Sequence, residues 1–169
     1  FNLGCAYYDG VHVQQNYEVA AKWYTLAAEH GIANAQHNLG CMHVEGQGVQ
    51  QNYDIALRWF NLAAEQGDAG AQHNLGCMYN EGQGVLQNYD IALRWFHLAA
   101  EQGYADSQHN LGTMYHKGNG VPQNYETAAK WYTLSAEQGN CVCQHNLGAM
   151  YSKGEGVIQD IETAIHWYT

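Results

Sequence analysis

The stretch QHNLG at residues 72–76 decides the fold, because the same five letters also begin at Gln36, Gln108 and Gln144. Each copy therefore lies 36 residues after the last, and the opening residues FNLG form the end of one more copy. A fixed period of this size is typical of a solenoid, in which each repeat contacts only its neighbours. The period therefore predicts an extended array whose surface is suited to holding a partner.

Each repeat is predicted to fold as a helical hairpin. Helix A is expected over residues 34–45, where one face carries Ala35, Leu39, Met42, His43 and Gly46. Glycines in the run 46–49 can close that helix, and Asn52 can cap the helix that follows. Helix B is expected to stop at Gly67, with a buried stripe formed by Ala56, Trp59, Phe60, Ala63 and Ala64.

Glycine recurs inside every predicted helix A, at positions 4, 40, 76, 112 and 148. Inside a helix, glycine costs about 1 kcal/mol relative to alanine. A cost repeated in every unit indicates a packing requirement, and we expect helix B to approach helix A closely at these points.

These residues carry a resemblance to a known family. The unit from Ala71 to Gly103 combines LG, MY, GQGV, NY, WF and LAAE at fixed offsets, and it resembles the Sel1-like repeat, a relative of the tetratricopeptide repeat. The resemblance covers the whole chain and implies an all-α fold, a right-handed alpha-alpha superhelix of almost five 36-residue helical hairpins. It also implies a concave side lined by the A helices and a role as an adaptor or scaffold.

Two positions depart from the repeat pattern. His12 stands in place of the second loop glycine, and Asp160-Ile161 stands in place of the usual Asn-Tyr. The first change raises the question of whether the loop at residues 10–13 keeps its shape. Because the chain starts without Met inside a repeat, we expect residues 1–169 to be one solenoid domain and a fragment of a longer array.

Composition narrows the classes of partner. The chain carries 16 Asp and Glu against 6 Lys and Arg, a formal net charge of -10. Phosphate backbones are bound by clustered basic residues, so we expect no nucleic-acid partner. No apolar run approaches the roughly 18 residues of a membrane span, and no basic amphipathic stretch suggests a membrane surface. We therefore expect a protein or peptide as partner.

The five cysteines do not suggest a disulfide framework. Cys5, Cys41 and Cys77 occupy one repeat position, and stacked helices lie about 8–10 Å apart, beyond the Cα separation of a disulfide. Cys141 and Cys143 lie two residues apart near a predicted helix start and point in different directions. We expect free thiols, which favours a reducing compartment.

Histidine also forms a column, at positions 37, 73, 109 and 145, and its first member is Phe1. Phenylalanine cannot ligate a metal, so the column favours rings that fill space between helices. The alternative is a zinc site, because His37 and Cys41 are spaced to share one helix face. The cysteine column changes to Thr113 and Ala149, which leaves too few thiolates, so we expect neither a metal nor a cofactor.

Asparagine fills one position in all five repeats. An amide that both donates and accepts can hold an extended peptide backbone by paired hydrogen bonds. The same amide could instead tie its own loop or the backbone of the next repeat. Both interpretations stay open, and the predicted partner-binding residues of this column are Asn38, Asn74, Asn110 and Asn146.

A charged column completes the predicted binding surface. The residue before the first loop glycine changes from acid to base along the chain, in the order Asp9, Glu45, Glu81, Lys117 and Lys153. The position just before it varies most, and Asn80 and His116 are its predicted contact residues. Our hypothesis is that a ligand segment of opposite charge polarity lies along the groove. The alternative is a solvated helix end.

We therefore predict a protein-interaction scaffold that binds a peptide or protein segment on the concave face. One alternative is a structural spacer within a larger protein. An alternative of another class is a β-lactam-binding or β-lactam-hydrolysing enzyme, since some disulfide-rich members of the family have been linked to that activity. The chain lacks their paired cysteines and has no Ser-x-x-Lys, Gly-x-Ser-x-Gly or His-Glu-x-x-His motif, so we expect no catalysis. Apolar surface at the array ends predicts end-to-end self-association.

Overall fold

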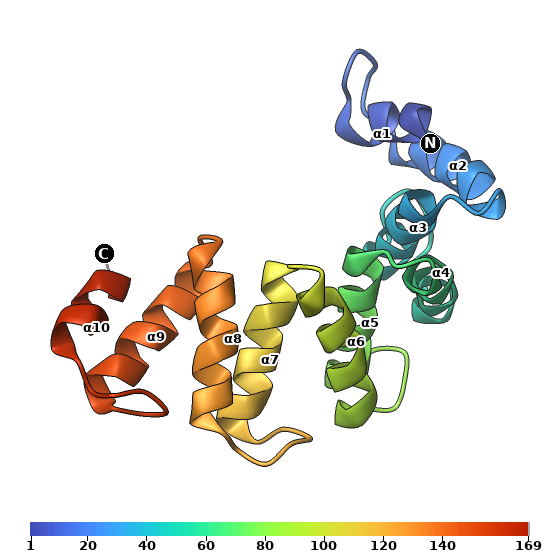
Figure 1. Ribbon diagram of the computed structural model, residues 1–169. Coiled ribbons are helices and arrows are strands. Elements are labelled where there is room, and N and C mark those ends of the chain that lie inside the picture. Colours follow the sequence, from blue (N-terminus) through green and yellow to red (C-terminus); the bar gives the residue numbers. More distant parts are fainter. Residues whose placement is uncertain (169) are drawn as a thin grey trace. The chain divides into compact units, whose positions relative to one another are not determined.

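The computed structural model describes residues 1–168, and over that range the chain forms ten α-helices and no strand. Helices A and B alternate along the chain (Figure 1), which confirms the predicted all-α repeat fold. The A helices are α1 (Asn2–Asp9), α3 (Ala33–Glu45), α5 (Ala69–Glu81), α7 (Ala105–Lys117) and α9 (Cys141–Lys153). The B helices are α2 (Tyr17–Glu29), α4 (Tyr53–Glu65), α6 (Tyr89–Glu101), α8 (Tyr125–Glu137) and α10 (Ile161–Tyr168).

The chain divides into two compact units. Unit 1 runs from Phe1 to Gln87 and contains α1 to α5, and unit 2 starts at Asn88 and contains α6 to α10. The division falls inside the third repeat, between its helix A and its helix B. Within each unit, every helix packs against the one that precedes it and the one that follows it.

The ends of helix A and helix B are fixed by the residue types predicted from the sequence. Gly46 closes α3 with φ 71°, in the left-handed region that glycine adopts without strain. Asn52 caps α4, because its side-chain oxygen accepts a hydrogen bond from the Ile55 backbone N–H at 3.0 Å. Asp160 performs the equivalent role for α10, where its carboxylate accepts from the Glu162 N–H at 3.0 Å and from the Thr163 hydroxyl at 2.6 Å.

The loop at residues 10–13 keeps the left-handed turn of the other repeats despite its histidine. His12 has φ 65°, and it is the one non-glycine residue of the described chain with a positive φ. The equivalent glycine of the next repeat, Gly48, has φ 66°. Repeat geometry therefore imposes the left-handed conformation on a residue that disfavours it.

The core of each repeat is built mainly from the predicted stripes. Leu39 and Met42 on α3 are buried, as are Ala56 and Phe60 on α4. The prediction was wrong for Trp59, which is only half-buried and packs at the edge of a core cluster. Trp59 directly precedes Phe60, so its side chain points about 100° away from the buried phenylalanine around the helix axis. Its indole therefore covers the core rather than filling it.

Helix crossings explain the glycines inside helix A. A Cβ added to Gly40 would lie 2.6 Å from the ring of Phe60, and one added to Gly148 would lie 2.6 Å from the ring of Tyr168. Real Cβ atoms do not come so close to other heavy atoms. The predicted close approach of helix B is therefore confirmed, and an aromatic ring is the group that needs the space.

A buried glutamine ties consecutive repeats together, and the sequence analysis did not single it out. Gln36 is 3% exposed, and its Nε2 donates to the Ala28 carbonyl at the end of α2 at 3.0 Å. The oxygen of the same amide accepts from Gln66 Nε2 at 2.7 Å. In unit 2, Gln108 donates to the Ala100 carbonyl at 3.2 Å in the same way. Each of these helix-end carbonyls also accepts a turn N–H, from Gly31 and Gly103 at 3.0 Å, so the glutamine uses the second acceptor site of a carbonyl in the last helical turn.

Candidate helix A binding surface

The most variable position of the repeat is the one just before the charged column, and the fold holds its backbone in place. In unit 2, Gln123 Nε2 donates to the carbonyl of His116 at 2.8 Å. In unit 1, Gln51 Nε2 donates to the carbonyl of Val44 at 2.7 Å. All five repeats make this bond, with the further donors and acceptors Gln15 to Tyr8, Gln87 to Asn80 and Gln159 to Ser152. The backbone is therefore constant at this position while the side chain varies.

A cavity of about 550 Å³ lies in unit 2 on the side chains of α7 and α9. We call it the α7–α9 cavity. It is lined by His109, Asn110, Thr113, His116, Lys117, Tyr125, Tyr132, Asn146, Ala149, Met150, Lys153 and Glu155. Five of the predicted partner-binding residues are therefore brought together here: Asn110, His116, Lys117, Asn146 and Lys153.

Unit 1 has a smaller hollow of about 120 Å³ in the equivalent place, on α3 and α5. We call it the α3–α5 hollow. It contains two predicted residues, Asn74 and Glu45, and is lined by Cys41, Val44, Glu45, Phe60, Asn74, Cys77, Met78 and Gln83. For each of these residues, the equivalent residue two repeats later lines the α7–α9 cavity. The two sites are therefore copies of one site with different linings.

Two tyrosines position the variable residue of the α7–α9 cavity. The His116 ring lies edge-on to Tyr125 with the ring centroids 5.1 Å apart, and it also contacts Tyr132 at 6.3 Å. In the first repeat, Tyr8 makes the same pair of contacts, to Tyr17 at 5.2 Å and to Tyr24 at 6.3 Å. Both the backbone and the ring of this residue are thus fixed by repeat geometry.

The asparagines of the predicted column bond to the preceding repeat. Asn74 Nδ2 lies 3.1 Å from His37 Nε2 and donates to Cys41 Sγ at 3.4 Å. Asn146 shares a hydrogen bond with the buried Tyr132, and Asn38 does so with Tyr24. Asn74 and Asn146 therefore tie the stack together and also line the two sites, so the two interpretations of this column are compatible.

Three predicted residues line neither site. Asn38 contacts Tyr24, at the first repeat junction. The Asn80 carbonyl accepts the bond from Gln87, and the Glu81 carboxylate accepts from Gln83 Nε2 at 2.7 Å. Asn80 and Glu81 lie at the end of α5, the last helix of unit 1.

Several lining residues were missed by the sequence analysis as contributors to a site. Thr113 and Ala149 were noted only as breaks in the cysteine column, and Tyr132 and Glu155 were not considered. A comparison of equivalent repeat positions could have identified them, because unit 1 has different residues there, namely Cys41, Cys77, Phe60 and Gln83.

The histidine column packs against the aromatic residue of helix B, as predicted. Ring centroids lie 6.0 Å apart for His37 and Phe60, and 6.2 Å apart for His109 and Tyr132. Burial lowers the pKa of His109, and Lys117 lowers it further although Asp106 raises it. Burial also holds the pKa of His37 below its usual value, outweighing the opposite effect of Asp68 at 3.5 Å.

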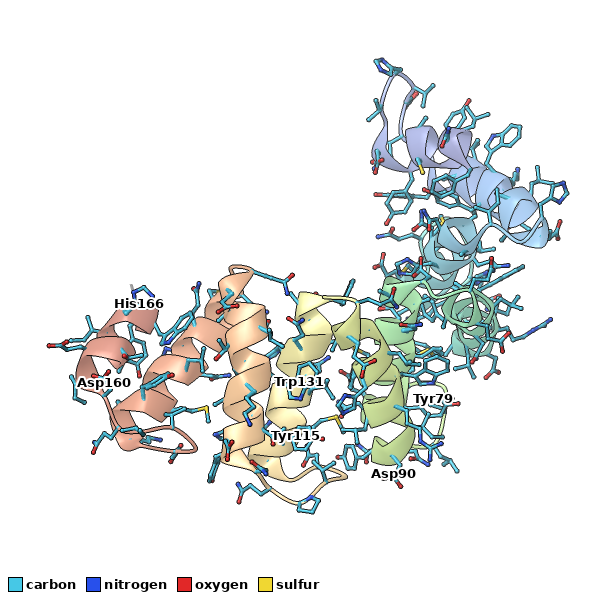
Figure 2. All side chains as sticks on the ribbon, in the orientation of Figure 1. Tyr79, Asp90, Tyr115, Trp131, Asp160 and His166 are labelled. Atoms are coloured by element: carbon cyan, nitrogen blue, oxygen red, sulfur yellow. The ribbon has the colours of Figure 1, made fainter. Side chains whose placement is uncertain are left out.

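A second histidine environment lies on unit 2. The His97 ring on α6 contacts Trp131 on α8 at 5.5 Å and Tyr115 on α7 at 6.5 Å between ring centroids. Figure 2 labels both of these partners. Burial lowers the pKa of His97, whereas Glu101 raises it. These rings fill space between helices in the same way as the histidine column.

The cysteines are free thiols, as predicted. Burial and the Glu45 carboxylate raise the pKa of Cys41 to about 11, so its thiol is protonated at neutral pH. Within residues 1–168, no group of three or more His, Cys, Asp or Glu side chains is arranged to hold a metal ion. None of the helices in that range has the length and apolar character of a membrane span.

Solved structures include close matches to this fold. A protective antigen of uropathogenic Escherichia coli, c5321, is 42% identical with a TM-score of 0.95, and the match covers 98% of this chain and 36% of the antigen. The chain thus spans about a third of the length of that protein. A Sel1 repeat protein from Oxalobacter formigenes is 35% identical with a TM-score of 0.94, covering 99% of this chain and 68% of the other.

A more distant match shares the fold alone. The immunity protein Pa5087 of Pseudomonas aeruginosa is 20% identical with a TM-score of 0.52, over 99% of this chain and 80% of the other. A search of the curated proteins gave no match. The model of the Sel1 repeat matches residues 1–32, 33–68, 69–104, 105–140 and 141–169. Sel1 repeat proteins generally serve as scaffolds for protein interactions. The chain belongs to the Sel1 repeat family.

Proposed function

We propose that this chain is a scaffold that binds an extended segment of a partner protein on the helix A surface. The observation that carries the proposal is the pair of equivalent sites, the α3–α5 hollow and the α7–α9 cavity. Of their shared positions, only the asparagine (Asn74 and Asn146) and the methionine (Met78 and Met150) keep the same residue. A lining that changes while its place stays fixed is typical of a recognition surface on a repeat scaffold.

Core positions of the same helices behave in the opposite way. Leu39 recurs as Leu111, and Gly40 recurs as Gly112, each without change. Packing therefore fixes these two positions, whereas the less buried lining residues Val44, Glu45 and Gln83 change to His116, Lys117 and Glu155. This contrast supports recognition over a spacer role, because a spacer needs the core alone.

The lining also suits a peptide backbone. Asn110 and Asn146 bring side-chain amides to the α7–α9 cavity, and Thr113 and Tyr132 bring hydroxyls. Amides and hydroxyls both donate and accept, so they can bond to the N–H and C=O groups of an extended segment. A volume of about 550 Å³ falls within the range of roughly 300–1,000 Å³ that ligand sites occupy.

A selection experiment tests the proposal. The immobilised protein is used to select from a phage library of random peptides of about 12 residues, which span roughly 40 Å when extended. We expect enriched peptides that lose binding to C77W/A149W, in which a large ring fills both sites. Binding should persist to K130W, which places the same ring on the exposed face of α8. Circular dichroism checks that each variant is folded.

Two results would overturn the proposal. The selection could enrich no peptide, or the enriched peptides could bind C77W/A149W as well as they bind the unchanged protein. The second result would place recognition away from the helix A surface.

We further propose that the chain is not an enzyme. Support comes from the roles of its reactive side chains: the His109 ring packs on Tyr132, and the raised pKa of Cys41 leaves a protonated thiol that is a poor nucleophile. A chromogenic β-lactam assay checks the main alternative. Hydrolysis of nitrocefin above the buffer rate would contradict this proposal.

A further inference from the structure

The α7–α9 cavity and the α3–α5 hollow differ most in charge. Lys117 lines the cavity where Glu45 lines the hollow, so one repeat position changes from acid to base. Lys153 adds a second ammonium group to the cavity from the next repeat. Glu155 is the one carboxylate of the cavity lining. The two lysines therefore leave a surplus of positive charge, whereas Glu45 makes the hollow negative.

This surplus is unusual for the chain, which has 6 Lys and Arg and a formal net charge of -10. Two of these six basic residues line one cavity. Lys130, which lies on α8 in the same unit, is instead paired with Glu126 at 2.8 Å. The chain as a whole repels anions, but the α7–α9 cavity attracts them. Complementarity of charge therefore favours an acidic partner at this cavity.

We propose that the α7–α9 cavity binds an acidic segment of a partner protein, with an internal Asp or Glu side chain held by Lys117 and Lys153. This inference rests on the proposed function and names its ligand. Asn146 and His116 supply polar contacts beside the two ammonium groups. Lys153 lies 3.8 Å from Glu155, a long distance for an ion pair, and its side chain is 63% exposed.

Glu155 lies beside Lys153 at the edge of the proposed ligand site. Its carboxylate competes with the ligand for Lys153, at the long distance of 3.8 Å. The equivalent residue of the hollow is Gln83, so the repeat accepts a neutral amide at this position. E155Q should therefore strengthen the binding of an acidic peptide without disturbing the fold.

The residues of unit 1 suggest a set of substitutions that should weaken binding of the acidic segment to the α7–α9 cavity. H116V, K117E and K153E together give the cavity the residues found at the same positions of unit 1, namely Val44, Glu45 and Glu81. Each replacement is one that the repeat already carries, so the triple variant should fold. K130E changes the same charge on the exposed face of α8 and serves as the control.

The experiment selects peptides from a phage library in which every peptide is fused at its carboxyl end, so that only side chains supply carboxylates. We expect the unchanged protein to enrich peptides rich in Asp and Glu, and the triple variant to lose this enrichment. A selected peptide, made with an amidated C-terminus, should bind the triple variant about tenfold more weakly and E155Q more tightly. K130E should change its affinity less than about twofold, and salt should weaken binding to the unchanged protein.

The outcomes separate this inference from the proposed function. Enriched peptides without an acidic bias that still fail to bind C77W/A149W would overturn the inference and leave the proposed function standing. Acidic peptides that bind the triple variant and the unchanged protein equally would also overturn the inference. If the amidated peptide does not bind but its free acid does, the ligand is a terminal carboxylate and the assignment to an internal side chain is wrong. A library that yields no peptide would overturn both.

Discussion

The ring of Phe60 on α4 lies against Gly40 on α3 so closely that a Cβ on the glycine would stand 2.6 Å from the ring. In the equivalent hairpin of unit 2, the ring of Tyr132 lies against Gly112, where a Cβ would stand 2.5 Å away. The hairpin therefore has a fixed crossing point, set by the absence of a side chain on one helix and the presence of an aromatic ring on the other.

The first prediction is that G40A destabilises the protein. Alanine is the better helix former by about 1 kcal/mol, but its methyl group would overpack the crossing, which typically costs 1–3 kcal/mol and can cost more. We expect the free energy of unfolding in urea to fall by about 2 kcal/mol, because the buried ring of Phe60 must shift to make room for the methyl group.

Its control is the same change made beside a smaller residue. In an F60L background, G40A should cost less than about 1 kcal/mol, because leucine lacks the ring atoms that the methyl group meets. Equal costs in the two backgrounds would show that Phe60 is not the group that requires a glycine.

The second prediction concerns Asn74, which bonds to His37 and Cys41 of the preceding repeat. N74A should lower the free energy of unfolding by about 1–2 kcal/mol, because it removes the partner of a part-buried imidazole nitrogen. Thermal unfolding followed by circular dichroism measures the effect. An unchanged midpoint would argue that Asn74 serves recognition alone.

How far the sequence predicts the fold depends on whether a residue acts within its own repeat. The glycine of the helix crossing and the asparagine cap act locally, so a 36-residue period and helix geometry predicted Gly40 and Asn52 correctly. Trp59 was misplaced, because a half-buried edge position and a core position look alike in a helical stripe. Gln36 was missed, because its partner Ala28 belongs to another repeat and its bond leaves no trace in the hydrophobic pattern.

The candidate site was predicted in part for the same reason. The change from Glu45 to Lys117 is visible in the repeat alignment, and both residues do line the equivalent sites. Tyr132 and Glu155 reach the cavity only because α8 and the loop after α9 stack beside α7. A single repeat contains none of that stacking, so its sequence cannot show which columns share a cavity.

The third prediction is a fall in stability as the pH drops through the titration range of histidine. Burial lowers the pKa of His37, His97 and His109 from the usual 6.5. The unfolded chain therefore binds more protons than the folded chain in this range, and the free energy of unfolding decreases as pH falls. The contribution of these three histidines to the free energy of unfolding is complete well above pH 6.5 and declines below that pH. Carboxylates such as Glu126 and Asp160 titrate at lower pH.

The matched variant for this prediction is H109F. Phenylalanine already occupies the column in the first repeat. The ring centroids of Phe1 and Tyr24 lie 5.9 Å apart, and those of His109 and Tyr132 lie 6.2 Å apart. The melting temperature of H109F should fall less than that of the unchanged protein between about pH 7.5 and about pH 5.5. Parallel curves for the two proteins would contradict a role for His109 in the pH dependence.

The last prediction uses the strained loop of the first repeat. His12 holds φ 65°, a conformation that costs a residue with a Cβ roughly 1–2 kcal/mol. Glycine avoids this cost but loses more conformational entropy on folding, by roughly 0.5–1 kcal/mol. H12G should therefore raise the free energy of unfolding by up to about 1 kcal/mol, measured in urea. H12A separates the two contributions, because it removes the imidazole and keeps the Cβ. We expect no gain from H12A, and a gain equal to that of H12G would mean that the histidine ring, rather than the backbone conformation, destabilises the loop.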